Sequence, residues 1–131
     1  VDVLEAWCAH DVGRAINPGA VEGQIEGGFV QGLGYALFEE MVWADGRLIN
    51  PTLMDYKIPG PCDIPTEIHP IIIEDPEPTG PFGAKGVGEP GLVPVAPAIA
   101  NAIHDATQIR FYQHPINPQK ILTALTNQPD H

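Results

Sequence analysis

Residues 20–41 read AVEGQIEGGFVQGLGYALFEEM, and this stretch decides the fold that we expect. Its apolar residues recur three and four positions apart, as Val21, Ile25 and Leu33 show, which is the spacing of one helix face. The stretch therefore predicts a helix from about Ala20 to Met41. It also holds five glycines, and each interior glycine costs a helix about 1 kcal/mol relative to alanine.

The glycines of this predicted helix need a compensating reason. Gly23 and Gly27, like Gly28 and Gly32, stand four positions apart and so form a smooth face without side chains. Such a face usually marks close approach to another surface, and polar neighbours such as Glu22 argue against a lipid surface. The spacing leaves open whether the face meets protein backbone or a bound cofactor.

The rest of the chain predicts short strands and two more helices. We expect strands at residues 3–8, 67–74 and 109–112, a hairpin with an Asp-Gly turn at 42–49, and helices at 92–107 and 117–125. Prolines break residues 50–65 into a stiff, irregular connection. The sequence therefore predicts a mixed α+β fold of helices and short strands, without repeats, in a single domain over residues 1–131.

The charge and cysteine content of the chain limit its partners and its compartment. Six Lys and Arg against 17 Asp and Glu give a formal net charge of −11, which would repel nucleic acid and anionic membranes. The sequence contains neither a signal-peptide pattern nor an apolar run of about 18 residues that could span a bilayer. Cys8 and Cys62 form no C-x-x-C pair, so a reducing compartment is the default. We expect a cytoplasmic protein that binds neither nucleic acid nor a membrane.

The start of the sequence bears on how much of a functional site it holds. Val1 lies in or beside a predicted strand, and no methionine precedes it. We therefore expect a fragment of a longer polypeptide, with a split subunit as the alternative. A fragment would carry only part of a site.

A single carboxylate stands among glycines at residues 83–91, GAKGVGEPG. Pro90 favours the first position of a helix, so Glu89 is expected beside a helix N-terminus, where the macrodipole favours its ionised form. A carboxylate held charged on such a loop can accept a proton, which makes Glu89 the candidate general base. The alternative is a plain helix start, since the spacing matches neither standard phosphate-binding glycine loop.

The other side chains support fewer kinds of chemistry. The histidines show no H-x-x-x-H or H-E-x-x-H spacing, so we expect no metal ion held by protein side chains. No G-x-S-x-G elbow and no activated cysteine points to a nucleophile. Lys85 remains as an anion contact, with Gln24 and Gln31 as neutral amides. We expect Gln24 near the N-terminus of its helix, where free N–H groups can hold an anion, and two such glycine-rich helix starts indicate an extended anionic cofactor.

Taken as an ordered set, several motifs resemble the C-terminal part of the molybdenum-binding subunit of the xanthine dehydrogenase/aldehyde oxidase family. They are D-V-G at 11–13, I-N-P at 16–18, G-Q-I-E-G-G at 23–28, Q-G-L-G at 31–34, E-E at 39–40, Y-K-I-P at 56–59, I-P-T-E at 64–67 and G-V-G-E-P at 86–90. The resemblance is collinear over residues 3–126. No motif is specific alone, but the ordered set is.

The resemblance implies a hydroxylase that oxidises an aldehyde or an N-heteroaromatic compound at a molybdenum ion. In that family molybdopterin holds the ion, often as the cytosine dinucleotide, and no protein side chain ligates it. The family pattern makes Glu89 the general base at the molybdenum centre. The residues that the resemblance assigns to cofactor binding, directly or as candidates, are Gln24, Gly23, Gln31, Lys85, Gly86 and Gly88.

The same resemblance implies partners for this chain. Electrons would leave through iron–sulfur clusters, commonly to FAD, on partner domains or subunits. The upstream part of the molybdenum subunit would supply further cofactor contacts and much of the substrate pocket, so the chain is expected to be inactive alone. A function of another class stays open, namely a non-catalytic module that binds a partner subunit or supports cofactor insertion.

Overall fold

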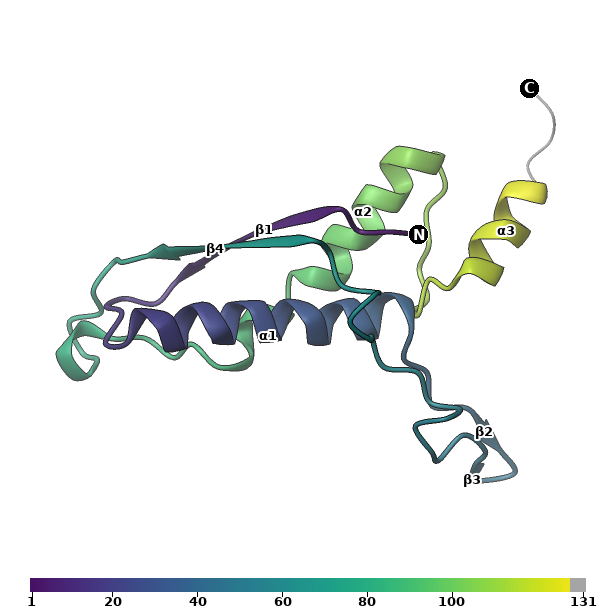
Figure 1. Ribbon diagram of the computed structural model, residues 1–131, viewed down its shortest axis with the longest axis horizontal. Helices are drawn as coiled ribbons and strands as arrows, with labels where there is room; N and C mark the ends of the chain where they lie inside the picture. Colours follow the sequence, from purple (N-terminus) through teal and green to yellow (C-terminus); the bar gives the residue numbers. More distant parts are fainter. Residues whose placement is uncertain (128–131) are drawn as a thin grey trace.

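The computed structural model describes residues 1–127 and combines two paired strands with one long and several short helices (Figure 1). In chain order the elements are β1 (Glu5–Asp11), α1 (Pro18–Leu37), β2 (Trp43–Ala44), β3 (Arg47–Leu48), β4 (Glu67–Ile73), the 3-10 helices η1 (Pro81–Gly83) and η2 (Glu89–Leu92), α2 (Val95–Thr107) and α3 (Pro118–Thr126). This mixed α+β arrangement confirms the predicted fold class.

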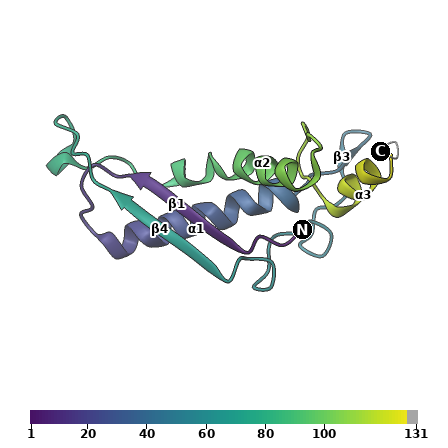
Figure 2. The same ribbon diagram turned by 90° about the horizontal axis from the view of Figure 1, so that it is seen from above.

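β1 and β4 pair in parallel along their full length, starting with Glu5 opposite Glu67. Parallel strands cannot be joined by a tight turn, and α1 lies in the crossover connection, packed along one face of the pair (Figure 1, Figure 2). Successive side chains alternate between the faces, so Ala6 is buried toward α1 while Trp7 is 64% exposed. On the outer face Trp7 stacks on His69, with ring centroids 5.0 Å apart.

α1 confirms the predicted glycine-containing helix, with shifted ends. Asn17 caps it, because its side-chain oxygen accepts a hydrogen bond of 3.2 Å from a first-turn N–H, and Pro18 takes the first helical position. The helix ends at Leu37 rather than Met41. The next two N–H groups both bond to the Gly34 carbonyl, at 2.9 and 2.8 Å, and so close the last turn.

Two apolar clusters hold α1 against its neighbours. The larger cluster joins α1 to α2 and α3 through buried side chains such as Leu33, Ile99 and Ile121. The smaller cluster joins the first half of α1 to the residue that follows β1, through Val12, Val21 and Ile25. Each end of α1 is therefore fixed to a different part of the fold.

The glycine face of α1 is divided between protein contacts and open space. A Cβ on Gly32 would lie 2.5 Å from the Cβ of Val95 in α2, and a Cβ on Gly28 would lie 3.1 Å from the backbone of η2. Nothing lies within 4 Å of the same point on Gly23 or Gly27. Protein thus occupies one part of the face, and the other part is free to meet something else.

Residues 39–64 form an arm that projects away from the rest of the fold (Figure 1). Its tip is the predicted hairpin of β2 and β3, turned by Asp45 and Gly46 with φ angles of 48° and 74°, as an Asp-Gly turn requires. At its base the Tyr56 hydroxyl donates a hydrogen bond of 2.6 Å to Glu39, which raises the pKa of that hydroxyl. The irregular connection predicted after the hairpin is confirmed.

One predicted strand is wrong, because residues 109–112 form no ladder in the structure. The N–H of Ile109 bonds to the hydroxyl of Thr107 at 3.2 Å, and the Arg110 guanidinium donates to the Asn101 side chain at 3.0 Å. These contacts fold the segment back on the end of α2. The segment has a β-prone composition, but no neighbouring strand within residues 1–127 pairs with it.

The other predicted elements are present with shifted ends. The first strand runs from Glu5 to Asp11 rather than over residues 3–8, and the last helix begins at Pro118 after its Asn117 cap, as expected. The helix predicted over residues 92–107 begins later, as α2 at Val95, and Leu92 is the last residue of the preceding turn η2. Pro94 stands at the start of α2 and cannot donate a backbone hydrogen bond, which favours a break there.

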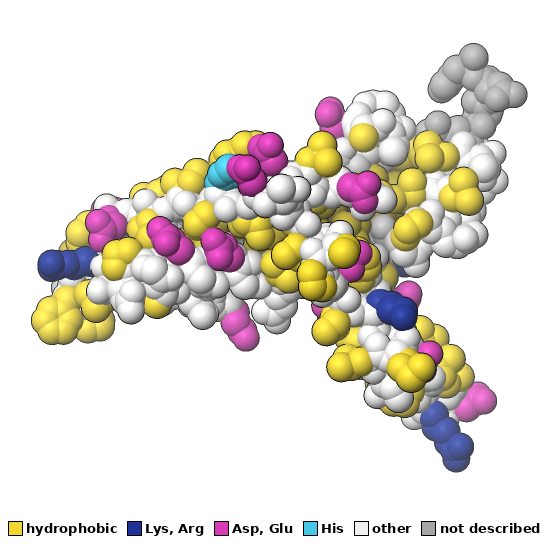
Figure 3. Space-filling model, viewed as in Figure 1, with side chains coloured by type: hydrophobic (Ala, Val, Ile, Leu, Met, Phe, Trp, Pro, Cys, Tyr) yellow, Lys and Arg dark blue, Asp and Glu magenta, His cyan; other side chains and the backbone are white. Residues whose placement is uncertain are grey.

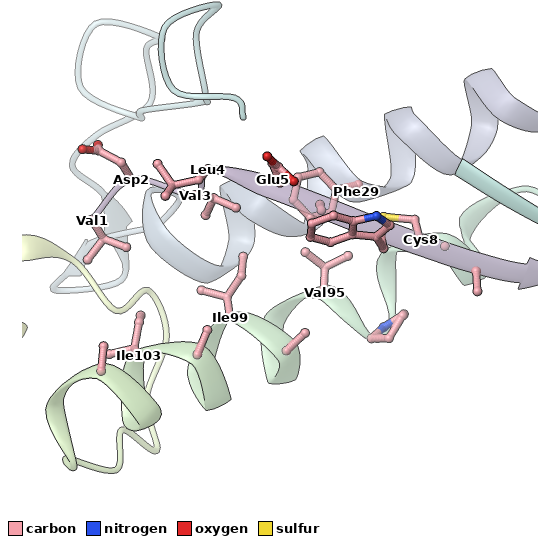
Figure 4. A pocket seen from close by; sticks show the side chains of 18 of the residues that line it. Val1, Asp2, Val3, Leu4, Glu5, Cys8, Phe29, Val95, Ile99 and Ile103 are labelled. Atoms are coloured by element: carbon pink, nitrogen blue, oxygen red, sulfur yellow. The ribbon is translucent and has the colours of Figure 1, made fainter. Parts of the chain in front are cut away.

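Apolar side chains remain exposed over wide areas, and Figure 3 shows many of them on the arm. A groove of about 880 Å³ also runs between β1 and α2, lined by side chains such as Phe29, Val95 and Ile103 (Figure 4). Contiguous exposed apolar surface is typical of interaction sites. Among residues 1–127, no helix has the length and apolar character needed to cross a membrane.

Gly32→Ala is expected to destabilise the subunit that contains this chain by about 1–3 kcal/mol, because the added methyl group overpacks against Val95. Gly27→Ala is the matched control, for which open space and better helix propensity predict a gain of about 1 kcal/mol. Urea unfolding measures both changes. Combining Gly32→Ala with Val95→Ala should cost less than the two single changes together, and full additivity would contradict the contact.

Candidate functional site

The candidate site begins with a backbone contact between η2 and α1. A Cβ atom on Gly28 would lie 3.1 Å from the C atom and 3.3 Å from the Cα atom of Gly91. In turn, a Cβ on Gly91 would lie 3.8 Å from the carbonyl oxygen of Gln24. Because η2 begins at Glu89, the two glycine-rich segments that the sequence singled out touch each other.

The segment before Glu89 runs along the end of β1. The N–H of Lys85 donates a hydrogen bond of 2.8 Å to the carbonyl of Val12. Gly13 is buried at this crossing with a φ of +66°, and a side chain on it would clash with the carbonyl oxygen of Gly83. Both the left-handed backbone and the lack of space require glycine there.

An ion pair between Asp11 and Lys85 closes this crossing. Lys85 Nζ lies 2.5 Å from Asp11 Oδ2 and 3.8 Å from Asp75 Oδ2. The other carboxylate oxygen, Asp11 Oδ1, accepts the N–H of Gly13 at 2.9 Å and that of Asp75 at 3.3 Å. The hydrogen bonds from Lys85 and from Gly13 lower the pKa of Asp11, and the bond to Asp11 raises the pKa of Lys85. Both groups are therefore charged at neutral pH.

Glu89 is an exposed residue in a segment that packs against the rest of the fold on both sides. On one side Val87 packs against the smaller apolar cluster, and on the other η2 lies on α1. Gly86 and Gly88, which flank Val87, face open space, and the Glu89 side chain is exposed. The predicted helix start is thus a 3-10 turn, with Glu89 as its first residue.

Gln24 lies beyond the first turn of α1, which corrects the prediction that it sits near the helix N-terminus. Pro18 begins the helix, so the free N–H groups belong to earlier residues, and Asn17 already binds one of them. Gln24 and Gln31 are both exposed and stand two turns apart on one face. Gly27 lies between them with open space above it, so the two amides flank a bare stretch of helix.

Asp11, Gly13 and Val87 hold the Glu89 segment in place, a role that sequence reasoning did not assign to them although they lie in motifs that it quoted. The D-V-G motif carried part of the signal, because an Asp two positions before a Gly often accepts its N–H in a turn, as Asp11 does here. The pairing with Lys85 spans 74 positions of sequence, and no local pattern indicates it.

Other reactive groups lie outside this arrangement. Within residues 1–127, no three His, Cys, Asp or Glu side chains gather so that they could hold a metal ion. Burial raises the pKa of the Cys8 thiol, which disfavours the thiolate form that a nucleophile needs. The groove between β1 and α2 is lined by neither Glu89 nor Gln24, although it reaches Gly91 and Ile25 at the contact between η2 and α1.

Comparison with known proteins identifies the family. The sequence model described as "Molybdopterin cofactor-binding domain" matches residues 1–65. Over 114 residues the chain is 41% identical to the xanthine dehydrogenase molybdenum-binding subunit of Escherichia coli O157:H7. The matched region covers 86% of this chain and 15% of that protein. The chain belongs to the xanthine dehydrogenase/aldehyde oxidase family. This confirms the resemblance drawn from the ordered motifs.

Solved structures similar to this family member have the same fold. Quinoline 2-oxidoreductase from Pseudomonas putida 86 matches with a TM-score of 0.86 and 36% identity, over 94% of this chain and 16% of that one. Aldehyde oxidoreductase from Desulfovibrio gigas matches with a TM-score of 0.83 and 39% identity, over 92% of this chain and 13% of that one. The chain thus spans 13–16% of the length of these three relatives.

The Asp11–Lys85 pair predicts how the Glu89 segment responds to pH. The lowered pKa of Asp11 means that its stabilising effect is complete above the unfolded value of about 3.9 and is lost as pH falls through the folded pKa. The raised pKa of Lys85 means that its effect is complete below about 10.4 and is lost as pH rises through the folded pKa.

Amide hydrogen exchange of residues 83–91, corrected for its intrinsic pH dependence, measures this response. Exchange should stay constant between about pH 5 and pH 9 and increase as the pH falls below the unfolded value of about 3.9. In Asp11→Asn the segment should exchange faster at neutral pH and respond less to acid. An identical acid response in both proteins would contradict the assignment.

Proposed function

We propose that Glu89 is the general base of a molybdenum hydroxylase and that Gln24 and its neighbours hold the molybdopterin cofactor. The backbone contact between η2 and α1 carries this proposal, because it sets an exposed carboxylate and an exposed amide on touching segments. A base must lie within hydrogen-bond reach of the proton that it takes, and a segment held on both sides meets that demand. Membership of the family supplies the class of cofactor.

The surface around Gln24 suits a flat, polar group of this kind. Four glycines leave the backbone bare on the two touching segments, namely Gly23, Gly27, Gly86 and Gly88. Bare backbone lets a ligand approach the main chain closely. Gln24 and Gln31 each offer an acceptor oxygen and two N–H donors, which suits a ligand that carries both donors and acceptors.

Each residue has a distinct role in this proposal. Molybdopterin supplies the molybdenum ion at which the substrate is oxidised. Glu89 accepts the proton released there, while the Gln24 and Gln31 amides orient the cofactor. The sequence also predicted Lys85 as a cofactor contact, but its ammonium already lies within 4 Å of two carboxylates, so this proposal gives it no contact with the cofactor.

The remaining parts of the proposal rest on the family. Relatives named as a xanthine dehydrogenase subunit and an aldehyde oxidoreductase support an N-heteroaromatic compound or an aldehyde as substrate. We propose the cytosine dinucleotide form of the cofactor, electron transfer to iron–sulfur clusters and FAD on partner domains or subunits, and a cytoplasmic location. Residues 1–131 act as one unit of a larger molybdenum subunit, whose other parts complete the pocket.

A non-catalytic module is a second candidate function, and the exposed apolar surface favours it. The groove beside β1 and the arm offer a partner wide contact areas that do not include Glu89. Such a module would bind its partner and leave turnover unchanged when Glu89 is replaced. The two candidates therefore differ in one measurable outcome.

Glu89→Gln in the complete enzyme is expected to lower kcat by about 100-fold or more, because the amide cannot accept the proton. Molybdenum and pterin content should stay near normal, since the side chain keeps its size. Glu40→Gln is the matched control, an exposed position on the arm that should retain activity. Normal turnover by Glu89→Gln would remove Glu89 from the mechanism and support the module.

Gln24→Ala is expected to weaken cofactor retention by about 10-fold, the size of one lost hydrogen bond. Molybdenum and pterin are measured per subunit after dialysis, because retention does not depend on turnover. Gln119→Ala on the exposed side of α3 provides the control for an amide lost elsewhere. Equal cofactor content in the two variants would show that Gln24 does not hold the cofactor.

A further inference from the structure

The Asp11 carboxylate joins three separate stretches of chain. It stands at the end of β1, and its Oδ1 accepts N–H groups from the Gly13 turn and from Asp75 after β4. Its Oδ2 binds the Lys85 ammonium, which belongs to the segment leading to Glu89. One side chain therefore links both strand ends to the proposed base.

Lys85 anchors the Glu89 segment twice, through its backbone and through its side chain. The backbone N–H bonds to the Val12 carbonyl at 2.8 Å, and Nζ binds Asp11. The next anchor is Val87 in the smaller apolar cluster, and the one after Glu89 is η2 on α1. A Cβ on Gly86 or Gly88 would meet nothing within 4 Å, so these glycines add no packing contact to the anchors that limit where Glu89 lies.

The surroundings of Lys85 favour this role over anion binding. Its ammonium lies within 4 Å of two carboxylates, those of Asp11 and Asp75, which leave local negative charge for an incoming anion to meet. The pair is also partly exposed, with 30% of the Lys85 side chain and 37% of the Asp11 side chain accessible. Exposed pairs contribute little to global stability, so the benefit of this pair lies in the geometry of what it holds.

We propose that the Asp11–Lys85 ion pair is a positioning device for Glu89. It ties the glycine-rich segment to the end of β1, so that the carboxylate of Glu89 stays at one place beside the cofactor-binding face of α1. Asp11 and Lys85 are positioning residues in this proposal and touch no reacting atom. The inference rests on the proposed function of Glu89, although the anchoring itself can be measured without catalysis.

The test uses the complete, cofactor-loaded enzyme with Asp11→Asn and Lys85→Met. Asn keeps an oxygen for the Gly13 and Asp75 N–H groups, and Met keeps the length of the Lys stem, so each change removes little besides the ion pair. We expect kcat to fall by about 10- to 100-fold, as a misplacement of about 1 Å would cause. Melting temperature and molybdenum content should match wild type. Asp105→Asn and Lys57→Met, both at exposed positions, control for the same changes of charge.

Three further measurements separate positioning from other roles. The double variant should be no slower than the slower single variant, because both remove one interaction. In a Glu89→Gln background, Lys85→Met should cost no further activity. Amide exchange of residues 83–91 should increase in Asp11→Asn and Lys85→Met but not in the controls.

Each contrary result overturns the proposal in a recognisable way. A loss of molybdenum content that parallels the loss of kcat in Lys85→Met would make Lys85 a cofactor contact instead. If Lys85→Met lowers kcat by the same factor in the Glu89→Gln background as in the wild-type enzyme, the pair acts independently of Glu89. Unchanged kcat and unchanged amide exchange would show that the pair positions nothing. If Glu89→Gln alone keeps normal turnover, the proposed function fails, while faster amide exchange would still establish the anchor.

Discussion

The backbones of α1 and η2 touch because Gly28 of the helix has no side chain. A Cβ on Gly28 would lie 3.1 Å from the carbonyl carbon of Gly91, so η2 would have to shift away from the helix and Glu89 would shift with it. The same contact sets the start of α2, because η2 leads directly into that helix and Val95 then meets Gly32. The packing of α1 against α2 and the position of Glu89 therefore depend on the same close contact between α1 and η2.

The Glu89 segment is attached to the rest of the fold on its inner side and is exposed on its outer side. Its inward contacts are an ion pair, a backbone hydrogen bond and the Val87 side chain, while Gly86, Gly88 and Glu89 face outward. This division suits a part of a larger enzyme in which another element covers the outer side. The exposed apolar groove and arm are consistent with such a partner, since the chain spans only 13–16% of its relatives.

Local patterns in the sequence were sufficient for most of the elements, and they singled out Glu89 and Gln24, whose roles stay proposals. The spacing of Val21, Ile25 and Leu33 predicted α1, and the Asp-Gly pair predicted the hairpin, because both signals lie within a few positions. The parallel pairing of β1 with β4 and the Asp11–Lys85 contact were not predicted, since each joins distant residues. The strand predicted at residues 109–112 was wrong because a β-prone composition does not guarantee a neighbouring strand with which to pair.

The pairing of β1 with β4 also has a consequence for biosynthesis. Glu5 meets Glu67, 62 positions further along the chain, and α1 and the arm are made in between. At a synthesis rate of about 5–20 residues per second, β1 waits about 3–12 s for the strand that completes it. Within residues 1–66, α1 is an element that contacts β1, so early formation of this helix would cover part of a strand whose edge is still unpaired.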